Sequence, residues 1–196
     1  MNKQQAEQDF LEYFSRAYGV LEASSFADLG IQGELRYYQK GEWLIRQGET
    51  APQLFYLISG LARYLSVSPE GKEFTQSFAL APGLAGSTRA MVRKTPAMFS
   101  IEALEDIICL EFDWQHLFNC IKQDIGFLET YAHMMETLFI GKEERENSFV
   151  HQSAEQRYLY FIEQKGELLD RVPLQYIASY IGITPVALSR IRKKLK

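Results

Sequence analysis

Seven short β-rich runs between residues 34 and 112 most constrain what this chain can fold into. They are rich in branched and aromatic residues, and turn signals such as Lys40-Gly41-Glu42 and Ser68-Pro-Glu-Gly71 separate them. Short, regularly spaced strands are typical of an antiparallel jelly roll or sandwich. The predicted strands cover residues 35–38, 43–45, 54–58, 61–67, 74–80, 99–103 and 107–112.

Helical patterns flank the predicted roll on both sides. Apolar residues at helical spacing predict an amphipathic helix over residues 2–18 and a second short helix near 21–29. After the roll, Asp113 can cap a short helix that ends near residue 122, and Asp124 can cap a long helix that runs toward residue 152. The polar segment 87–94 is compatible with a helix and interrupts the strands where it could roof a pocket.

The long predicted helix carries two neighbouring apolar stripes, so it must be covered on more than one side. The roll can cover one stripe, and the same helix of a second subunit is the natural cover for the other. A helix buried within a monomer is the alternative. We assign the dimer contact to the first stripe, Phe127, Tyr131, Met134 and Leu138, whereas the second contains Ile125, Leu128, Ala132, Met135 and Phe139.

Residues 174–193 have the pattern of two short helices joined by a tight turn. Gly182 permits the positive φ of such a turn, Thr184 can cap the second helix, and Pro185 fits its first turn. The apolar residues, including Ile177 and Leu188, can face inward, which leaves a cationic outer face. The pattern predicts a helix-turn-helix whose second helix binds DNA, although a helical hairpin with a solvated basic end is the simpler alternative. The predicted DNA-binding residues are Thr184, Pro185, Val186, Ser189, Arg190, Arg192 and Lys193.

Charge is distributed unevenly along the chain, although its formal net charge is only −4. Residues 153–196 contain eight Lys or Arg against four Asp or Glu, whereas residues 1–152 contain 13 against 21. A basic segment joined to an acidic one suits a protein that touches phosphate at one end only.

This order of parts resembles the Crp–Fnr family of bacterial transcription regulators. The resemblance is carried by Lys40-Gly-Glu-Trp-Leu-Ile-Arg-Gln-Gly-Glu49, Leu54-Phe-Tyr-Leu-Ile-Ser-Gly60, Pro82-Gly-Leu-Ala-Gly-Ser87, Ile101-Glu-Ala-Leu-Glu-Asp106 and Ile181-Gly-Ile-Thr-Pro-Val-Ala-Leu-Ser-Arg-Ile191. It implies an α+β fold with an N-terminal antiparallel β jelly roll (double-stranded β-helix), flanking helices, a long dimerisation helix and a small C-terminal helix-turn-helix domain. The implied divisions are a cyclic-nucleotide-binding-like sensor domain at 1–123, the dimerisation helix and hinge at 124–152, and the DNA-binding domain at 153–196.

The resemblance also implies a role and partners. We expect a homodimeric, cytoplasmic regulator of transcription that binds double-stranded DNA, with RNA polymerase as a further partner and no membrane contact. Two recognition helices would enter successive major grooves, and an effector in the roll would bias a rotation of the DNA-binding domains about a hinge at Gln152.

The ligand pocket departs from the family pattern for cyclic AMP. Members that bind cyclic AMP place a Glu where Ser87 stands, and an Arg with a hydroxyl neighbour where Ala97-Met98 stands. A phosphate without its guanidinium loses charge-assisted hydrogen bonds, so we predict that cyclic AMP does not bind tightly. Another small effector would occupy the same place, which is formed by Gly86, Ser87, Thr88, Arg89 and Met98.

For DNA, the resemblance places Arg190 at a position that reads bases, where its guanidinium would pair with a guanine. Pro185 and Val186 replace residues that contact bases in well-known members, and they offer only apolar contact. Thr184 and the cations Arg192, Lys193, Lys194 and Lys196 would meet phosphates. The segment 167–173 is short and leaves little room for the β wing that many relatives carry.

Other function classes lack the residues that they need. A metal-dependent cupin enzyme requires clustered His ligands in the roll, yet no His precedes His116. The two Cys cannot hold an iron–sulfur cluster. We therefore expect no catalytic residues and no metal site. A sensing or protein-interaction module with a vestigial DNA-binding domain is the alternative to a working regulator.

Overall fold

Two four-stranded antiparallel sheets form a β-roll at the centre of the structure. The computed structural model describes residues 1–18 and 26–195. The strand orders are β1-β8-β3-β6 in one sheet and β2-β7-β4-β5 in the other. The strands are β1 (Glu34–Tyr38), β2 (Trp43–Ile45), β3 (Gln53–Ser59), β4 (Leu61–Val67), β5 (Glu73–Leu80), β6 (Gly83–Gly86), β7 (Ser100–Ala103) and β8 (Ile107–Asp113).

The predicted strands are confirmed to within a residue or so at each end, and β6 is the strand that the sequence did not predict. Its four residues, Gly-Leu-Ala-Gly, contain no β-branched or aromatic side chain, so their pattern indicates a turn. Tertiary pairing overrides this weak propensity, because β6 lies alongside β3 with Tyr56 opposite Leu84. The helix predicted over 87–94 follows as α3 (Thr88–Arg93).

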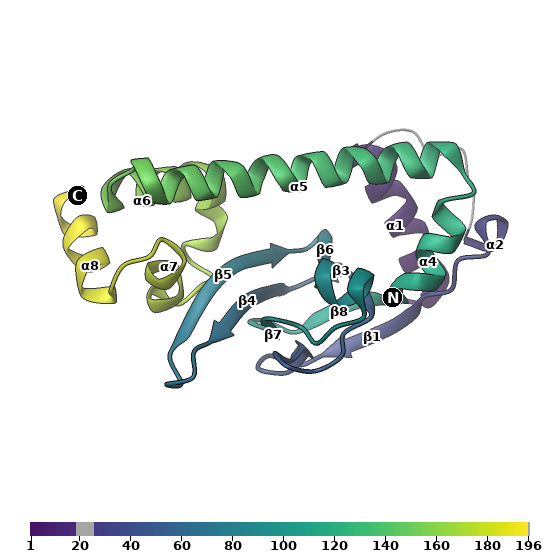
Figure 1. Cartoon of the computed structure of the whole chain (residues 1–196), viewed down its shortest axis with the longest axis horizontal. Coiled ribbons are helices and arrows are strands. Elements are labelled where there is room, and N and C mark those ends of the chain that lie inside the picture. The colour runs from purple at the N-terminus through teal and green to yellow at the C-terminus, as the bar shows by residue number, and fades with distance from the viewer. Residues whose placement is uncertain (19–25, 196) are drawn as a thin grey trace.

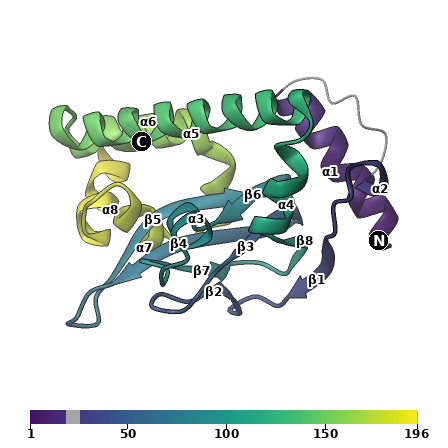
Figure 2. The same ribbon diagram turned by 45° about the vertical axis from the view of Figure 1, so that its right-hand side comes forward.

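Helices pack at one end of the roll, where α1 (Lys3–Tyr18) confirms the helix predicted over 2–18. Phe10 of α1 lies in the core, with its ring centroid 5.3 Å from that of Tyr56 and 5.1 Å from that of Phe112. Figure 2 shows α1 and α4 (Trp114–Ile121) between the roll and the first turns of the long helix α5 (Ile125–His151). Most of the short helix predicted near 21–29 lies outside the described residues, and its end is α2 (Phe26–Leu29).

Helix α5 confirms the predicted long helix and extends along the whole molecule above the roll (Figure 1). The Asp124 side chain accepts a hydrogen bond from the Phe127 amide at 2.8 Å, which fixes where the helix begins. Among the described residues, no helix combines the length and the apolar composition that crossing a bilayer requires.

Most of the first stripe of α5, which we assigned to the dimer contact, packs within the chain itself. Phe127 and Met134, which we assigned to a partner subunit, are only 0% and 4% exposed because α1, α4 and the roll already cover them. Tyr131 is half-buried against Trp114, and only Leu138 of the predicted set is exposed. The second stripe is the free one, with Ile125 72% and Phe139 64% exposed. Spacing alone shows that two stripes exist but not which one meets the roll.

The chain ends in a small group of helices, which we call the C-terminal helical unit (residues 153–195). It contains α6 (Ala154–Lys165), the 3-10 helix η1 (Gly166–Leu168), α7 (Leu174–Tyr180) and α8 (Pro185–Lys194). The predicted capping box of α6 is present, with Ser153 and Gln156 each bonding the backbone amide of the other. Between residues 153 and 195 the structure contains no strand.

The C-terminal helical unit shares a hydrophobic core with the roll. Leu61, Phe78 and Leu104 of the roll belong to the same buried cluster as Phe161, Ile177 and Leu188 of the unit. In particular, α7 lies against β5, as Figure 1 shows. A unit of about 40 residues can bury little surface by itself, and here the roll provides one wall of its core.

Candidate nucleic-acid interface and effector cavity

Helices α7 and α8 are joined by a tight turn whose geometry follows from three residues. Gly182 adopts φ +77°, which glycine tolerates and other residues rarely adopt. A Cβ added there would also lie 2.6 Å from a ring carbon of Phe149. The Thr184 hydroxyl then accepts a hydrogen bond from the Ala187 amide at 3.2 Å and begins α8, with Pro185 in its first turn.

Two arginines fasten this turn to the end of α5. Arg145 donates to the Tyr180 carbonyl at 2.9 Å, and Arg157 donates to the Ile181 carbonyl at 2.9 Å. Both guanidinium carbons lie 4.9 Å from the centre of the Phe149 ring. Cations beside the C-terminal carbonyls of a helix are favourable, so these contacts stabilise the position of α7 relative to α5.

The outer face of α8 carries the residues that the sequence assigned to DNA. The inward side is closed by Leu188, which is buried together with Ile177 and Ile181. All seven predicted residues are exposed, namely Thr184, Pro185, Val186, Ser189, Arg190, Arg192 and Lys193. Lys194 differs from them because its ammonium group lies 2.7 Å from a carboxylate oxygen of Glu155. Lys196 lies outside the described residues.

Helix α7 is docked on the roll through polar contacts as well as through the shared core. The Arg63 guanidinium carbon lies 3.6 Å from the centre of the Tyr176 ring. Ser179 of α7 accepts a hydrogen bond from the Thr75 amide of β5 at 2.9 Å. Before α7, Nε and Nη2 of Arg171 donate to the Glu105 carboxylate of the roll at 2.8 and 2.6 Å. These residues connect the two parts of the chain, and the sequence analysis did not identify them.

The predicted effector residues around α3 are engaged in the local structure. The Ser87 hydroxyl is buried and caps α3 by accepting from the Ala90 amide, while Arg89 donates to the Pro96 carbonyl at 3.1 Å. The Gly86 amide donates to the Tyr64 hydroxyl at 3.1 Å. Thr88 is exposed, and Met98 is 62% exposed. The structure thus brings Gly86, Ser87 and Arg89 to one segment, with Met98 directed to solvent beside it.

A large cavity of about 1240 Å³ lies between the roll and helices α5 and α6. Arg89 from α3 and Tyr64 from β4 line it at the roll, and Tyr131 and Met134 line it from α5. At its other end it reaches α6 and the turn after α7, where Arg145, Arg157 and Lys165 line it. Arg145 belongs to α5, and Arg157 and Lys165 belong to α6, so no local pattern in the sequence indicates that they meet at this end.

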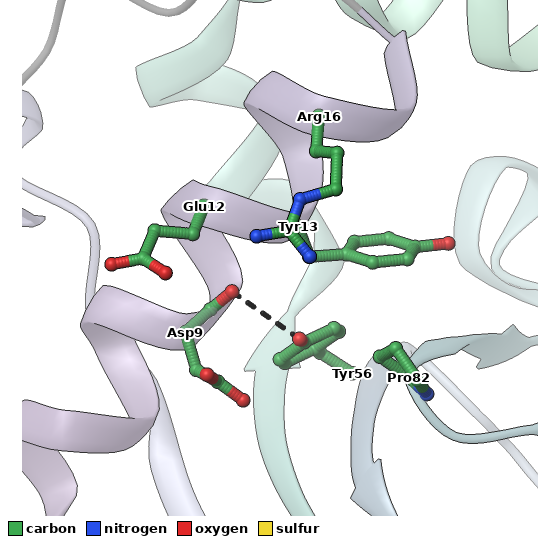
Figure 3. Close-up of a pocket in the computed structure, with 6 residues that line it drawn as sticks. All are labelled: Asp9, Glu12, Tyr13, Arg16, Tyr56 and Pro82. Atoms are coloured by element: carbon green, nitrogen blue, oxygen red, sulfur yellow. Dashed lines mark hydrogen bonds between the residues drawn. The ribbon is translucent and has the colours of Figure 1, made fainter.

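A smaller pocket of about 280 Å³ lies where α1 meets the roll (Figure 3). Four of its residues come from α1, and the Tyr56 hydroxyl donates to the Asp9 carbonyl at 3.3 Å across it. Burial raises the pKa of the Tyr56 phenol, and the carboxylate of Asp9 raises it further. The phenol is therefore a hydrogen-bond donor at neutral pH and holds α1 in place. The lining residues are Asp9, Glu12, Tyr13, Arg16, Tyr56 and Pro82.

The family model for the cyclic nucleotide-binding domain matches residues 35–124, the span of the β-roll and α4. This part of the chain is therefore similar to cyclic nucleotide-binding domains. No curated protein sequence matches the chain.

Solved structures extend the similarity from the cyclic nucleotide-binding domain to most of the chain. FixK2 from Bradyrhizobium japonicum is 18% identical, with a TM-score of 0.71 over 84% of this chain and 85% of that one. The c-di-GMP responsive global regulator CLP of Xanthomonas campestris is 15% identical, with a TM-score of 0.68 over 86% and 88%. CooA from Carboxydothermus hydrogenoformans, solved as a mutant, is 18% identical, with a TM-score of 0.67 over 94% and 83%. These structures share the fold of this chain, so the predicted fold class is confirmed.

Proposed function

We propose that this protein is a homodimeric transcription regulator that binds double-stranded DNA through α8. The observation that carries the proposal is the exposed face of α8, where Arg190, Arg192 and Lys193 are free of carboxylate partners in the described part of the chain. A capped helix N-terminus beside such cations suits phosphate contact. Of the two guanidinium groups on this face, that of Arg190 is placed to pair with a guanine edge and that of Arg192 to meet a phosphate in this proposal.

The dimer interface in this proposal is the exposed stripe of α5, in place of the stripe inferred from sequence. Ile125, Leu128 and Phe139 are large apolar side chains that lie exposed along one helix. Contiguous exposed apolar side chains mark interaction surfaces, and a twin α5 would cover them symmetrically. Dimerisation would place two α8 helices about 34 Å apart, one turn of B-DNA.

We assign three proposed functions to three parts of the chain. Effector sensing lies in residues 1–123, the dimer contact and hinge in 124–152, and the DNA contact in 153–196. Gln152 has an extended backbone between α5 and α6, which suits a hinge. Any rotation there must also separate α7 from β5, because the shared core joins them. Tight binding of cyclic AMP is not expected, since the buried Ser87 hydroxyl already caps α3.

A second candidate function is sensing or protein interaction with a vestigial DNA-binding unit. It is favoured by the first turn of α8, where Pro185 and Val186 offer no hydrogen-bonding side chain and Val186 is 63% exposed. Few polar contacts would then be available to bases.

Binding of the full chain to labelled duplex DNA, measured by fluorescence anisotropy at two salt concentrations, tests the proposal against this candidate. Phosphate contacts release counterions, so affinity should fall about a hundredfold between about 50 mM and about 200 mM salt. If no duplex from a pool of genomic fragments binds at the lower salt concentration, the vestigial alternative is correct.

A further inference from the structure

The cavity between the roll and α5 has an excess of positive charge that the chain as a whole does not have. Its charged lining residues are the five cations Arg89, Lys142, Arg145, Arg157 and Lys165 and the single carboxylate Glu144. The whole chain, by contrast, has a net charge of −4. Walls of one sign concentrate ligands of the opposite sign.

The positive charge is concentrated at the end of the cavity farthest from α3. There Arg145, Arg157 and Lys165, which we call the cation cluster, are half-buried. Arg145 donates to the Tyr180 carbonyl and also interacts with the Tyr180 side chain. Arg157 donates to the Ile181 and Gln152 carbonyls, and the nearby carboxylate of Glu144 accepts from the Tyr160 hydroxyl. Burial lowers the pKa of both Arg145 and Lys165, and each of these pKa values is lowered further by a neighbouring arginine. Glu167 partly offsets this effect on Lys165.

The rest of the cavity wall combines polar residues, such as Gln76 and Ser77 of β5, with a set of large apolar side chains. Met91 comes from α3, and Tyr131, Met134 and Leu138 come from α5. Methionine side chains adjust to ligands of irregular shape. Cavities with an apolar lining and a few convergent polar groups are typical of small-molecule sites.

We propose that this cavity binds an amphipathic organic anion, with its carboxylate or phosphate group at the cation cluster and its apolar body between α5 and the roll. Gly86, Thr88 and Arg89 of the predicted effector place line one end of the same cavity, whereas the proposed anion-binding end is built by α5 and α6. An anion there would contact the same two arginines that hold the turn between α7 and α8. Binding is independent of DNA, whereas a regulatory effect of the ligand rests on the proposed function.

Decanoate and decanol provide a matched pair of probes, since they share a hydrocarbon chain and differ in the charge of the head group. Calorimetry with the full chain, without DNA, should show that decanoate binds at least about tenfold more tightly than decanol. Lys165→Met should reduce the affinity for decanoate about tenfold, because Lys165 has no side-chain hydrogen bond to lose in the described structure. Lys122→Met removes an exposed ammonium group outside the cavity lining and should leave that affinity unchanged.

Arg89→Met tests where the anionic group lies, because Arg89 lines the same cavity from α3. We expect no more than a twofold change for this variant. Equal affinities for decanoate and decanol would overturn the proposal, as would a larger loss with Arg89→Met than with Lys165→Met. Since no DNA is present in these titrations, their outcome does not depend on whether α8 binds DNA.

Discussion

The guanidinium of Arg63 is enclosed between two glutamates and the ring of Tyr176, with its carbon 3.6 Å from the ring centre. One nitrogen lies 2.7 Å from Glu73 and another 3.0 Å from Glu102, and the residue is only 1% exposed. Arg63 belongs to β4 and Tyr176 to α7, so one buried side chain connects the roll to the C-terminal helical unit. A buried cation is costly once it loses its partners, so Arg63 holds the roll and the C-terminal helical unit together.

Replacing this arginine should destabilise the whole fold. Arg63→Met keeps much of the side-chain volume but leaves the mostly buried Glu102 without its cation, so we expect a loss of about 3 kcal/mol in the free energy of unfolding. Urea unfolding followed by circular dichroism measures this change. Arg36→Met is the matched control, because Arg36 also pairs with two glutamates but its side chain is 52% exposed. Its cost should stay below about 1 kcal/mol, and equal costs for the two variants would contradict the connecting role of Arg63.

In the proposed function, base reading by α8 depends on Arg190. Arg190→Ala should weaken binding to selected duplex sites by about 1–3 kcal/mol and relax base preference at one position. Arg192→Ala, which removes a phosphate contact, should instead weaken binding to all sequences alike and reduce the salt dependence. Selection of binding sites from random duplexes, followed by anisotropy, distinguishes the two effects. Uniform weakening by Arg190→Ala would make Arg190 a phosphate contact only.

Dimerisation through the exposed stripe of α5 can be tested with a single charge. Phe139→Asp would bury a carboxylate in a twin-helix interface, which is costly without a cation nearby, so we expect monomers at micromolar concentration in sedimentation velocity. Val92→Asp introduces the same charge at another exposed apolar residue, on α3, and should leave the dimer intact. A dimer that survives Phe139→Asp would refute this interface.

Acid should weaken the contact between Glu105 and Arg171. The hydrogen bonds from Arg171 hold the pKa of Glu105 below its ordinary value of 4.5. A carboxyl group whose pKa is lowered on folding stabilises the fold above its unfolded pKa and loses this contribution as the pH falls through its folded value. Because the pair is partly exposed, we expect about 0.5 kcal/mol. The difference in unfolding free energy between wild type and Glu105→Gln should therefore be largest near pH 7 and disappear below the folded pKa. A difference that is constant down to pH 3 would contradict this assignment.

Local signals in the sequence predicted most elements of the fold correctly. Asp113, Asp124, Ser153 and Thr184 cap the helices that they were expected to cap. These predictions succeeded because a cap, a turn or a strand period depends on residues that are close in the chain. Strand β6 was not predicted, because its own residues have low strand propensity. Only its pairing with β3, which is distant in the chain, makes it a strand.

Relationships between distant segments were not predictable in the same way. Phe127 and Met134, which were assigned to a partner subunit, are buried within the chain, because helical spacing does not say which neighbour covers a face. The contact of Arg63 with Tyr176 joins residues more than a hundred positions apart, and neither carries a local signal for it. The cation cluster has no local signal either, because only the folded chain brings Lys165 of α6 beside Arg145 of α5.

The common core of the roll and the C-terminal helical unit limits how this protein can be divided or recombined. A fragment that begins at residue 153 would lack Leu61, Phe78 and Leu104. The apolar side chains that pack against these three residues would then be exposed to water. Grafting the fragment onto a different sensor would succeed only if the recipient offered a matching apolar β surface. The C-terminal helical unit and the roll therefore have to be exchanged and engineered as one piece.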